Sequence, residues 1–240
     1  MSAERKIRVG ITQGDTNGIG YEVILKTLSN PEITELFTPV VYGSSKVMSY
    51  HRKALDLEMP QFNSVHYPDQ IKPNALNVVE VHAEEVKVEL GQPTEIAGEA
   101  AFVSLECAVA DLKDGVIDVL VTAPINKKTI QSDQFTFHGH TEYLEASIGE
   151  GQKALMILFN EKLRVALATT HIPVSQISAA ITKELIMEKL SAFNASLKQD
   201  FNISRPRIAV LALNPHAGDG GLLGKEEQDV ISPAVTEAYD

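Results

Sequence analysis

The sequence contains a single cysteine, Cys107, and therefore no partner with which it could form an internal disulfide. Cys107 lies within a helical pattern, and we expect it to be a small residue of the core. No apolar run approaches the ~20 residues that a membrane-spanning helix needs, and the first ten residues lack the apolar stretch of a secretory signal. These absences predict a cytoplasmic protein without a membrane partner.

The chain also lacks a cluster of basic residues. It carries 21 Lys and Arg against 32 Asp and Glu, which gives a formal net charge of −11. Because nucleic-acid phosphates are bound largely by clustered Lys and Arg, we expect no nucleic-acid partner. The 240 residues are 44% hydrophobic and 22% charged, as is usual for a globular protein, and they can bury one large core or two modest ones.

Strands and helices alternate along most of the chain, which is typical of an α/β protein with a mostly parallel sheet. A strand over residues 7–12 leads through a Gly-rich turn into a helix with Val23, Ile24 and Leu28 on one face. Further strands are expected at residues 39–42, 78–81, 118–122 and 208–213, further helices at 45–55, 98–113, 141–148, 174–198 (one or two) and 225–239, and a loop at 60–77.

Two short apolar runs, residues 155–159 and 163–168, flank the polar sequence Asn160-Glu161-Lys162. This pattern predicts a hairpin, which would add an antiparallel pair to the mostly parallel sheet. No shift in composition marks a domain boundary. From topology alone we expect a first α/β domain over residues 1–125 and a second, incomplete α/β domain over residues 126–240.

Two histidines, His171 and His216, each follow a predicted buried strand. Parallel strands present ligands at their carboxyl ends, so the two imidazoles could share one metal ion in a metal-assisted enzyme. A catalytic metal site has about three protein ligands, so this pair is one short. Alternatively, each histidine could be a hydrogen-bonded structural residue.

A Gly-rich segment, Gly14-Asp15-Thr16-Asn17-Gly18-Ile19-Gly20, joins a predicted strand to a predicted helix. Its glycines permit close approach of the backbone, and the helix start offers free N–H groups to an anion. The segment is neither G-x-G-x-x-G nor a Walker motif, so it gives little support to a nucleotide site. It could equally be a tight turn that needs small residues.

Two polar segments follow later in the chain. After a predicted strand, Lys127 or Lys128 could neutralise a phosphate or carboxylate, or accept a proton, although exposed lysines usually only solvate a surface. In His138-Gly139-His140-Thr141, a predicted helix start places His140 beside free N–H groups that could hold a phosphoryl oxygen. The alternative is that Thr141 caps the helix while both histidines lie on the surface.

Five motifs occur in order from the first predicted strand to the last predicted helix. They are Ile11-Thr12-Gln13-Gly14-Asp15 with Asn17-Gly18-Ile19-Gly20, Thr122-Ala123-Pro124 with Lys127, Gly139-His140-Thr141-Glu142, Ala168-Thr169-Thr170-His171, and Leu213-Asn214-Pro215-His216-Ala217-Gly218. Together they closely resemble the 4-hydroxythreonine-4-phosphate dehydrogenase family of vitamin B6 synthesis. The resemblance implies a two-domain fold like that of the isocitrate and isopropylmalate dehydrogenases, and a homodimer with active sites at its interface.

The resemblance also implies a reaction. NAD or NADP would oxidise 4-phosphooxy-L-threonine to 2-amino-3-oxo-4-phosphooxybutanoate, which decarboxylates to 3-amino-2-oxopropyl phosphate in pyridoxal phosphate biosynthesis. By motif, His140 and Thr141 would contact the substrate, and His171 and His216 would bind a divalent metal: zinc, cobalt or magnesium. Lys127 is the candidate catalytic residue.

This sequence departs from the family pattern in two ways. The family usually has Pro at the position of Thr16 and often at that of Tyr21, so the first turn is expected to be less rigid. The family also continues for about another hundred residues, the size of a further lobe. We expect a third metal-binding His, basic residues for the substrate phosphate and most nicotinamide contacts beyond Asp240, and therefore little or no turnover from these 240 residues alone.

Two other functions remain open from the sequence. The same motifs would serve a dehydrogenase for 4-phosphorylated threonate or erythronate in sugar-acid catabolism, whose substrate has a hydroxyl in place of the amine. A protein of another class, a non-catalytic metal- or phosphate-binding module, would explain the missing third ligand. It would not need all five motifs.

Overall fold

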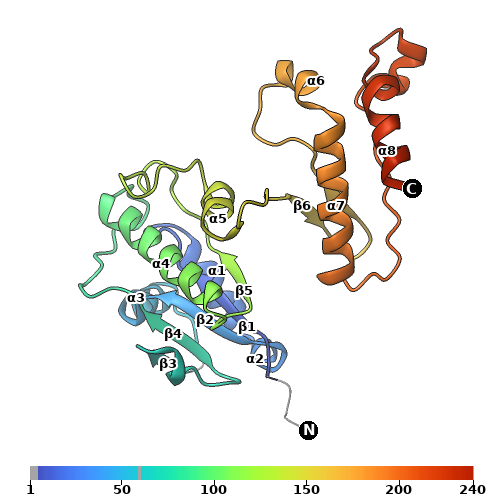
Figure 1. The fold of residues 1–240 in the computed structure, drawn as a ribbon. Helices are drawn as coiled ribbons and strands as arrows, with labels where there is room; N and C mark the ends of the chain where they lie inside the picture. Colours follow the sequence, from blue (N-terminus) through green and yellow to red (C-terminus); the bar gives the residue numbers. More distant parts are fainter. Residues whose placement is uncertain (1–4, 59–60, 240) are drawn as a thin grey trace. The chain divides into compact units, whose positions relative to one another are not determined.

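The computed structural model describes residues 5–58 and 61–239 (Figure 1). The chain forms two compact units, residues 1–152 and residues 153–240, which are described separately below. The domain boundary expected at residues 125/126 stays a prediction.

The first unit is built on a parallel sheet of five strands in the order β3-β4-β2-β1-β5. All five carboxyl ends therefore meet at one edge, where open α/β sheets bind ligands. The sheet and its helices confirm the predicted α/β class. The strands are β1 Arg8–Thr12, β2 Thr38–Gly43, β3 Phe62–Val65, β4 Leu76–Glu80 and β5 Val119–Thr122.

Helices of the first unit begin where side chains supply caps. Ser44 and Thr94 accept hydrogen bonds from backbone N–H groups in the first turns of α3 and α4, which satisfies donors that the helix leaves free. α4 packs on the sheet (Figure 1) and buries Leu105 and Ala108 completely. The helices are α1 Gly20–Leu28, α2 Glu32–Leu36, α3 Ser45–Ala54, the short η1 Pro68–Gln70, α4 Glu95–Lys113 and α5 His140–Ile148.

Two expectations for the first unit were wrong in part. The loop expected at residues 60–77 contains β3 and η1, because residues 62–65 pair in parallel with β4; residue 60 itself lies outside the described residues. Val23, expected on the buried face of α1, is 51% exposed, whereas Ile24 and Leu28 are buried.

The second unit contains the predicted hairpin, with β6 Ile157–Phe159 and β7 Arg164–Ala166 antiparallel. The Asn160 side chain accepts hydrogen bonds from the N–H groups of Lys162 and Leu163 and so shapes the turn. The pair forms a separate two-stranded sheet and does not join the five-stranded one. The helices are η2 Val174–Gln176, α6 Ile177–Ala180, α7 Lys183–Gln199, η3 Pro215–Gly221, the π-type η4 Glu227–Ile231 and α8 Ser232–Tyr239.

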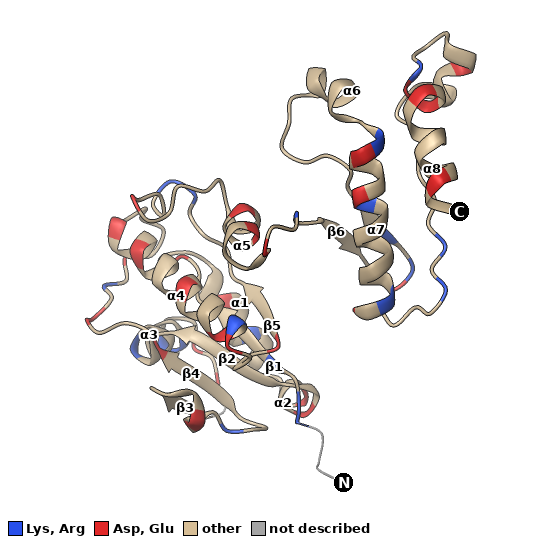
Figure 2. Cartoon of the chain, viewed as in Figure 1, with Lys and Arg blue, Asp and Glu red and all other residues tan. Residues whose placement is uncertain are grey.

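α7 and α8 pack side by side (Figure 1) around a small core that includes Ile186, Ile231 and Ala234. Acidic and basic residues are interspersed along α7 (Figure 2), so its charged side chains form no basic stripe. Among the described residues, no helix combines the length and apolar character that crossing a membrane requires.

The buried strand expected at residues 208–213 was wrong. These residues have no regular secondary structure, and Leu211 is 83% exposed. A strand is stabilised by hydrogen bonds to a neighbouring strand, and within the described part of the chain no strand pairs with this segment. Residues 208–213 therefore have the apolar pattern of a strand but no neighbouring strand with which to pair among the described residues.

Candidate active site

The Gly-rich turn after β1 packs against the loop after β5. The Asp15 N–H donates to the Pro124 carbonyl at 2.9 Å. Gly14 has a φ of 67°, and a Cβ at this position would lie 2.3 Å from the same carbonyl oxygen. Only glycine fits both the backbone angle and the close contact, so this turn fixes the start of the loop that carries Lys127.

The far end of that loop is held by α4. A Cβ on Gly98 would lie 1.9 Å from the Thr129 carbonyl oxygen, so the helix and the loop backbone touch directly. The Asn126 side chain accepts from the N–H groups of Lys128 and Thr129. Lys127 is exposed on a turn that is anchored on both sides.

α5 begins at the end of the next loop, which an aromatic cluster holds in place. Phe135 is fully buried and packs against Phe102, Phe137 and Tyr143, with ring centroids 5.4–5.8 Å apart. The N-cap of α5 is Gly139, and no side chain caps it. The alternative that Thr141 caps this helix is therefore wrong; Thr141 lies within the first turn.

His140 is the first residue of α5, and its Nε2 atom is buried without a hydrogen-bond partner among the described residues. Burial, and to a lesser degree the charge of Lys127, lowers the pKa of His140. The Lys127 ammonium is close: a Cβ on Gly139 would lie 3.9 Å from its Nζ. A neutral imidazole, an ammonium and a helix amino end thus lie together, an arrangement suited to an anionic ligand.

The second unit carries His171 and His216, both exposed and both at left-handed backbone angles, with φ of 55° and 53°. His171 lies five residues beyond the end of β7, and His216 lies in η3. Residues 216–220 all have positive φ. No group of three His, Cys, Asp or Glu residues able to hold a metal ion occurs within residues 5–58 and 61–239.

Glu226 and Glu227, near the start of the helix expected over residues 225–239, contact the loop before His216. Glu227 is buried, and its carboxylate accepts from the N–H groups of Leu213 and Asn214. These bonds from Asn214 and Leu213 lower the pKa of Glu227. No spacing in the sequence indicated this contact, because it depends on how residues 13 and 14 positions apart fold back on each other.

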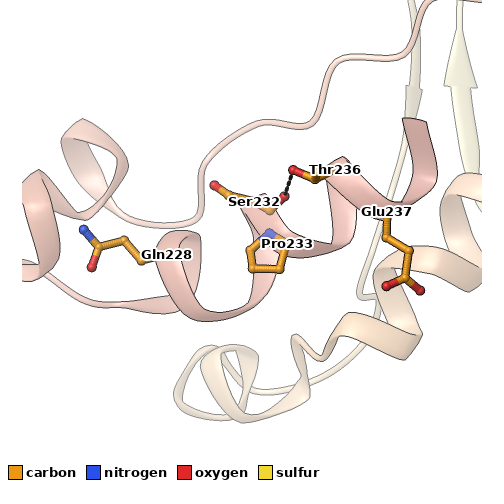
Figure 3. A pocket seen from close by; sticks show the side chains of 5 residues that line it. All are labelled: Gln228, Ser232, Pro233, Thr236 and Glu237. Carbon is orange, nitrogen blue, oxygen red and sulfur yellow. Dashed lines mark hydrogen bonds between the residues drawn. The ribbon is translucent and has the colours of Figure 1, made fainter. Parts of the chain in front are cut away.

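A pocket of about 560 Å³ lies on η4 and α8 (Figure 3). Its only charged side chain, Glu237, forms an ion pair with Lys183, and its Thr236 hydroxyl donates to the Ser232 carbonyl. None of the predicted site residues lines it.

The parallel sheet with polar loops at its carboxyl edge defines an open α/β protein, a class whose members typically bind ligands at that edge. The family described as "Pyridoxal phosphate biosynthetic protein PdxA" matches residues 35–240, and the chain belongs to this family. Its motifs had already indicated the relationship.

Named relatives agree with this family assignment. A 4-hydroxythreonine-4-phosphate dehydrogenase from Bacteroides thetaiotaomicron is 59% identical over 234 residues, which cover 98% of this chain and 64% of the relative. The crystal structure of the 4-hydroxythreonine-4-phosphate dehydrogenase from Klebsiella pneumoniae has a TM-score of 0.85 at 28% identity, covering 100% of this chain and 72% of that one. The chain thus spans about two thirds of the length of these relatives.

A third similarity concerns the fold alone. A terephthalate 1,2-cis-dihydrodiol dehydrogenase from Burkholderia xenovorans has a TM-score of 0.65 at 22% identity and covers 98% of this chain and 71% of that one. Proteins with different named substrates therefore share this fold, so the substrate must be argued from the site.

Proposed function

We propose that the full-length protein is a 4-hydroxythreonine-4-phosphate dehydrogenase. It oxidises 4-phosphooxy-L-threonine with NAD or NADP to 2-amino-3-oxo-4-phosphooxybutanoate, which decarboxylates to 3-amino-2-oxopropyl phosphate in pyridoxal phosphate synthesis. The observation that carries the proposal is the buried Nε2 of His140, which lies beside Lys127 at the start of α5 and has no hydrogen-bond partner within residues 5–58 and 61–239. A buried polar atom without a partner is costly, and a substrate oxygen or hydroxyl would satisfy it.

His140 and Thr141 bind the substrate in this proposal. Because the pKa of His140 is lowered, its imidazole is neutral at neutral pH and presents one donor and one acceptor nitrogen. The free N–H groups of the α5 amino end and the Lys127 ammonium complement a phosphate or carboxylate. We assign Lys127 the catalytic role of moving a proton at the substrate hydroxyl, which it would accept as the neutral amine; its position beside Gly139 at the start of α5 supports this assignment.

His171 and His216 are assigned as ligands of a divalent metal: zinc, cobalt or magnesium. Two exposed imidazoles fit such an ion as a partial ligand set. When bound there, the ion would lower the pKa of the substrate hydroxyl and polarise the carbonyl that forms. No residue is assigned to the nicotinamide cofactor.

The remaining parts of the proposal follow the family resemblance. The substrate is a small phosphorylated hydroxy acid, the protein is a cytoplasmic homodimer with active sites at the subunit interface, and neither nucleic acid nor a membrane takes part. An apparent molar mass of the full-length protein in solution that matches one chain would contradict the dimer.

Kinetics of the full-length protein test this function. We expect NAD(P)H formation with 4-phosphooxy-L-threonine, and a large loss of kcat/KM in His140→Ala and Lys127→Met. Lys128→Met is the matched control, because Lys128 is exposed on the same turn and should retain activity. A higher kcat/KM with 4-phosphorylated threonate or erythronate would overturn the substrate assignment in favour of sugar-acid catabolism, and no turnover of any of these would favour a binding module.

A further inference from the structure

Glu227 is a buried acidic residue with a specific set of partners. It is 6% exposed. Its Oε1 accepts from the backbone N–H groups of Leu213 at 2.8 Å and Asn214 at 2.6 Å, and its Oε2 accepts from the Asn214 side chain at 3.0 Å. The carboxylate thus holds the backbone immediately before Pro215 and His216 with charge-assisted hydrogen bonds.

Glu226 extends these contacts to the other histidine segment. Its Oε2 accepts from the Asn214 side chain at 2.7 Å, and its Oε1 accepts from the Ser178 hydroxyl on α6. Ser178 lies seven residues after His171, and Asn214 lies two residues before His216. One carboxylate therefore bridges the segments that carry the two imidazoles, although these segments are more than thirty residues apart in the sequence.

The backbone at His216 also needs such support. Residues 216–220 lie in the left-handed region, which costs non-glycine residues free energy and persists only where the surroundings enforce it. Gly218 is buried within this turn, and a Cβ there would lie 3.0 Å from Oε2 of Glu227 and 2.5 Å from the Gly224 carbonyl oxygen. Gly218 in this turn thus lies close against the Glu227 carboxylate.

An ordinary helix start does not explain these contacts. Acidic residues at a helix amino end interact with the free N–H groups of that helix. The carboxylates of Glu226 and Glu227 reach backbone N–H groups at their own helix start and, in addition, Leu213, Asn214 and Ser178, which lie in other segments.

We propose that Glu226 and Glu227 are positioning residues that hold the His171 and His216 segments at the spacing needed for both imidazoles to bind one divalent ion. This inference rests on the proposed function of the two histidines as metal ligands. Residues that orient metal ligands typically change metal affinity 10- to 100-fold when they are altered.

The test is a Co²⁺ titration of the metal-free full-length protein, followed by the visible absorption of bound Co²⁺. In Glu227→Gln, an amide NH₂ replaces one acceptor and opposes the donors of Asn214 and Leu213, so we expect binding about 10- to 100-fold weaker with an altered Co²⁺ spectrum. Asp229→Asn is the matched control, an exposed acid on the same η4 helix, and should bind as the wild type does. Ser178→Ala, which removes one surface bond, should weaken binding less.

Thermal unfolding of the metal-free variants shows whether each variant is folded, so that weaker Co²⁺ binding caused by lost positioning can be told from weaker binding caused by a general loss of stability. If Glu227→Gln and Ser178→Ala bind Co²⁺ like the wild type while His216→Ala does not, the positioning role is overturned and the metal site stands. If His171→Ala and His216→Ala both bind like the wild type, the proposed metal site itself fails. If Glu227→Gln does not fold, weaker Co²⁺ binding by folded Ser178→Ala supports the positioning role, and wild-type binding by it overturns that role.

Discussion

Single residues connect the first turn to the rest of the first unit. The Tyr21 hydroxyl donates to Oε1 of Gln13 at 2.6 Å and accepts from the Ser44 N–H at 3.1 Å. Nε2 of Gln13 in turn donates to the Ala100 carbonyl and to Nε2 of His82. We expected a less rigid turn because Tyr21 stands where the family often has Pro, but the hydroxyl supplies hydrogen bonds that a proline cannot make.

Removal of this hydroxyl should therefore be costly. In Tyr21→Phe, Oε1 of Gln13 loses a donor and the Ser44 N–H loses an acceptor in the buried core, which costs about 1–3 kcal/mol of unfolding free energy. Urea unfolding measures this difference. Tyr50→Phe, at an exposed tyrosine, is the control and should be near neutral; equal midpoints for the two variants would contradict the account.

Three histidines make stability depend on pH. Burial is the largest cause that lowers the pKa of His51, His82 and His140 below the ordinary value of 6.5. For His82 the geometry agrees, because Gln13 has only donors at Nε2 and so needs an unprotonated His82 Nε2.

The direction of this pH dependence follows from the protonation of the three histidines in the folded and the unfolded chain. Well above pH 6.5 these histidines are neutral in both the folded and the unfolded chain, and as the pH falls through 6.5 the unfolded chain takes up protons first. The unfolding free energy should therefore fall from pH 7.5 to pH 5, with NMR titration midpoints of His51 and His82 below 6.5. Midpoints above this value would contradict the assigned burial.

Among the elements, sequence patterns predicted those strands whose apolar residues are buried locally, such as β1 and β2. They missed β3, whose strand character depends on pairing with β4, and they predicted a strand at residues 208–213 that has no neighbour to pair with. Periodicity reports which side chains can be buried, whereas a strand also requires a partner elsewhere in the chain.

The contact between α4 and the Lys127 loop gives a prediction at this scale. A Cβ on Gly98 would overlap the Thr129 backbone, so Gly98→Ala must push the loop away and should lower the free energy of unfolding by about 1–3 kcal/mol. Because Lys127 lies on this loop, we also expect the KM of the full-length protein to rise. Gly18→Ala is the control for stability, because its Cβ would meet only ordinary contacts at 3.5–3.7 Å. Chemical denaturation of the two variants makes the comparison, and an equal loss in both would contradict direct packing at Gly98.

At the scale of the whole molecule, the order of five short motifs was enough to place the chain in its family, which the match over residues 35–240 confirms. The candidate residues Lys127 and His140 could be found in the same way, and the structure brings them together around α5. Glu226 and Glu227 could not be, because their roles arise from contacts with residues up to 48 positions away.

The proposed chemistry depends on His171 and His216 binding one divalent ion in the full-length protein. Anomalous diffraction at the zinc edge, from crystals of that protein grown with Zn²⁺, tests it directly. We predict one peak within about 2.0–2.1 Å of a ring nitrogen of both histidines. A peak that touches only one of them, or no peak beside either, would contradict the metal-dependent mechanism.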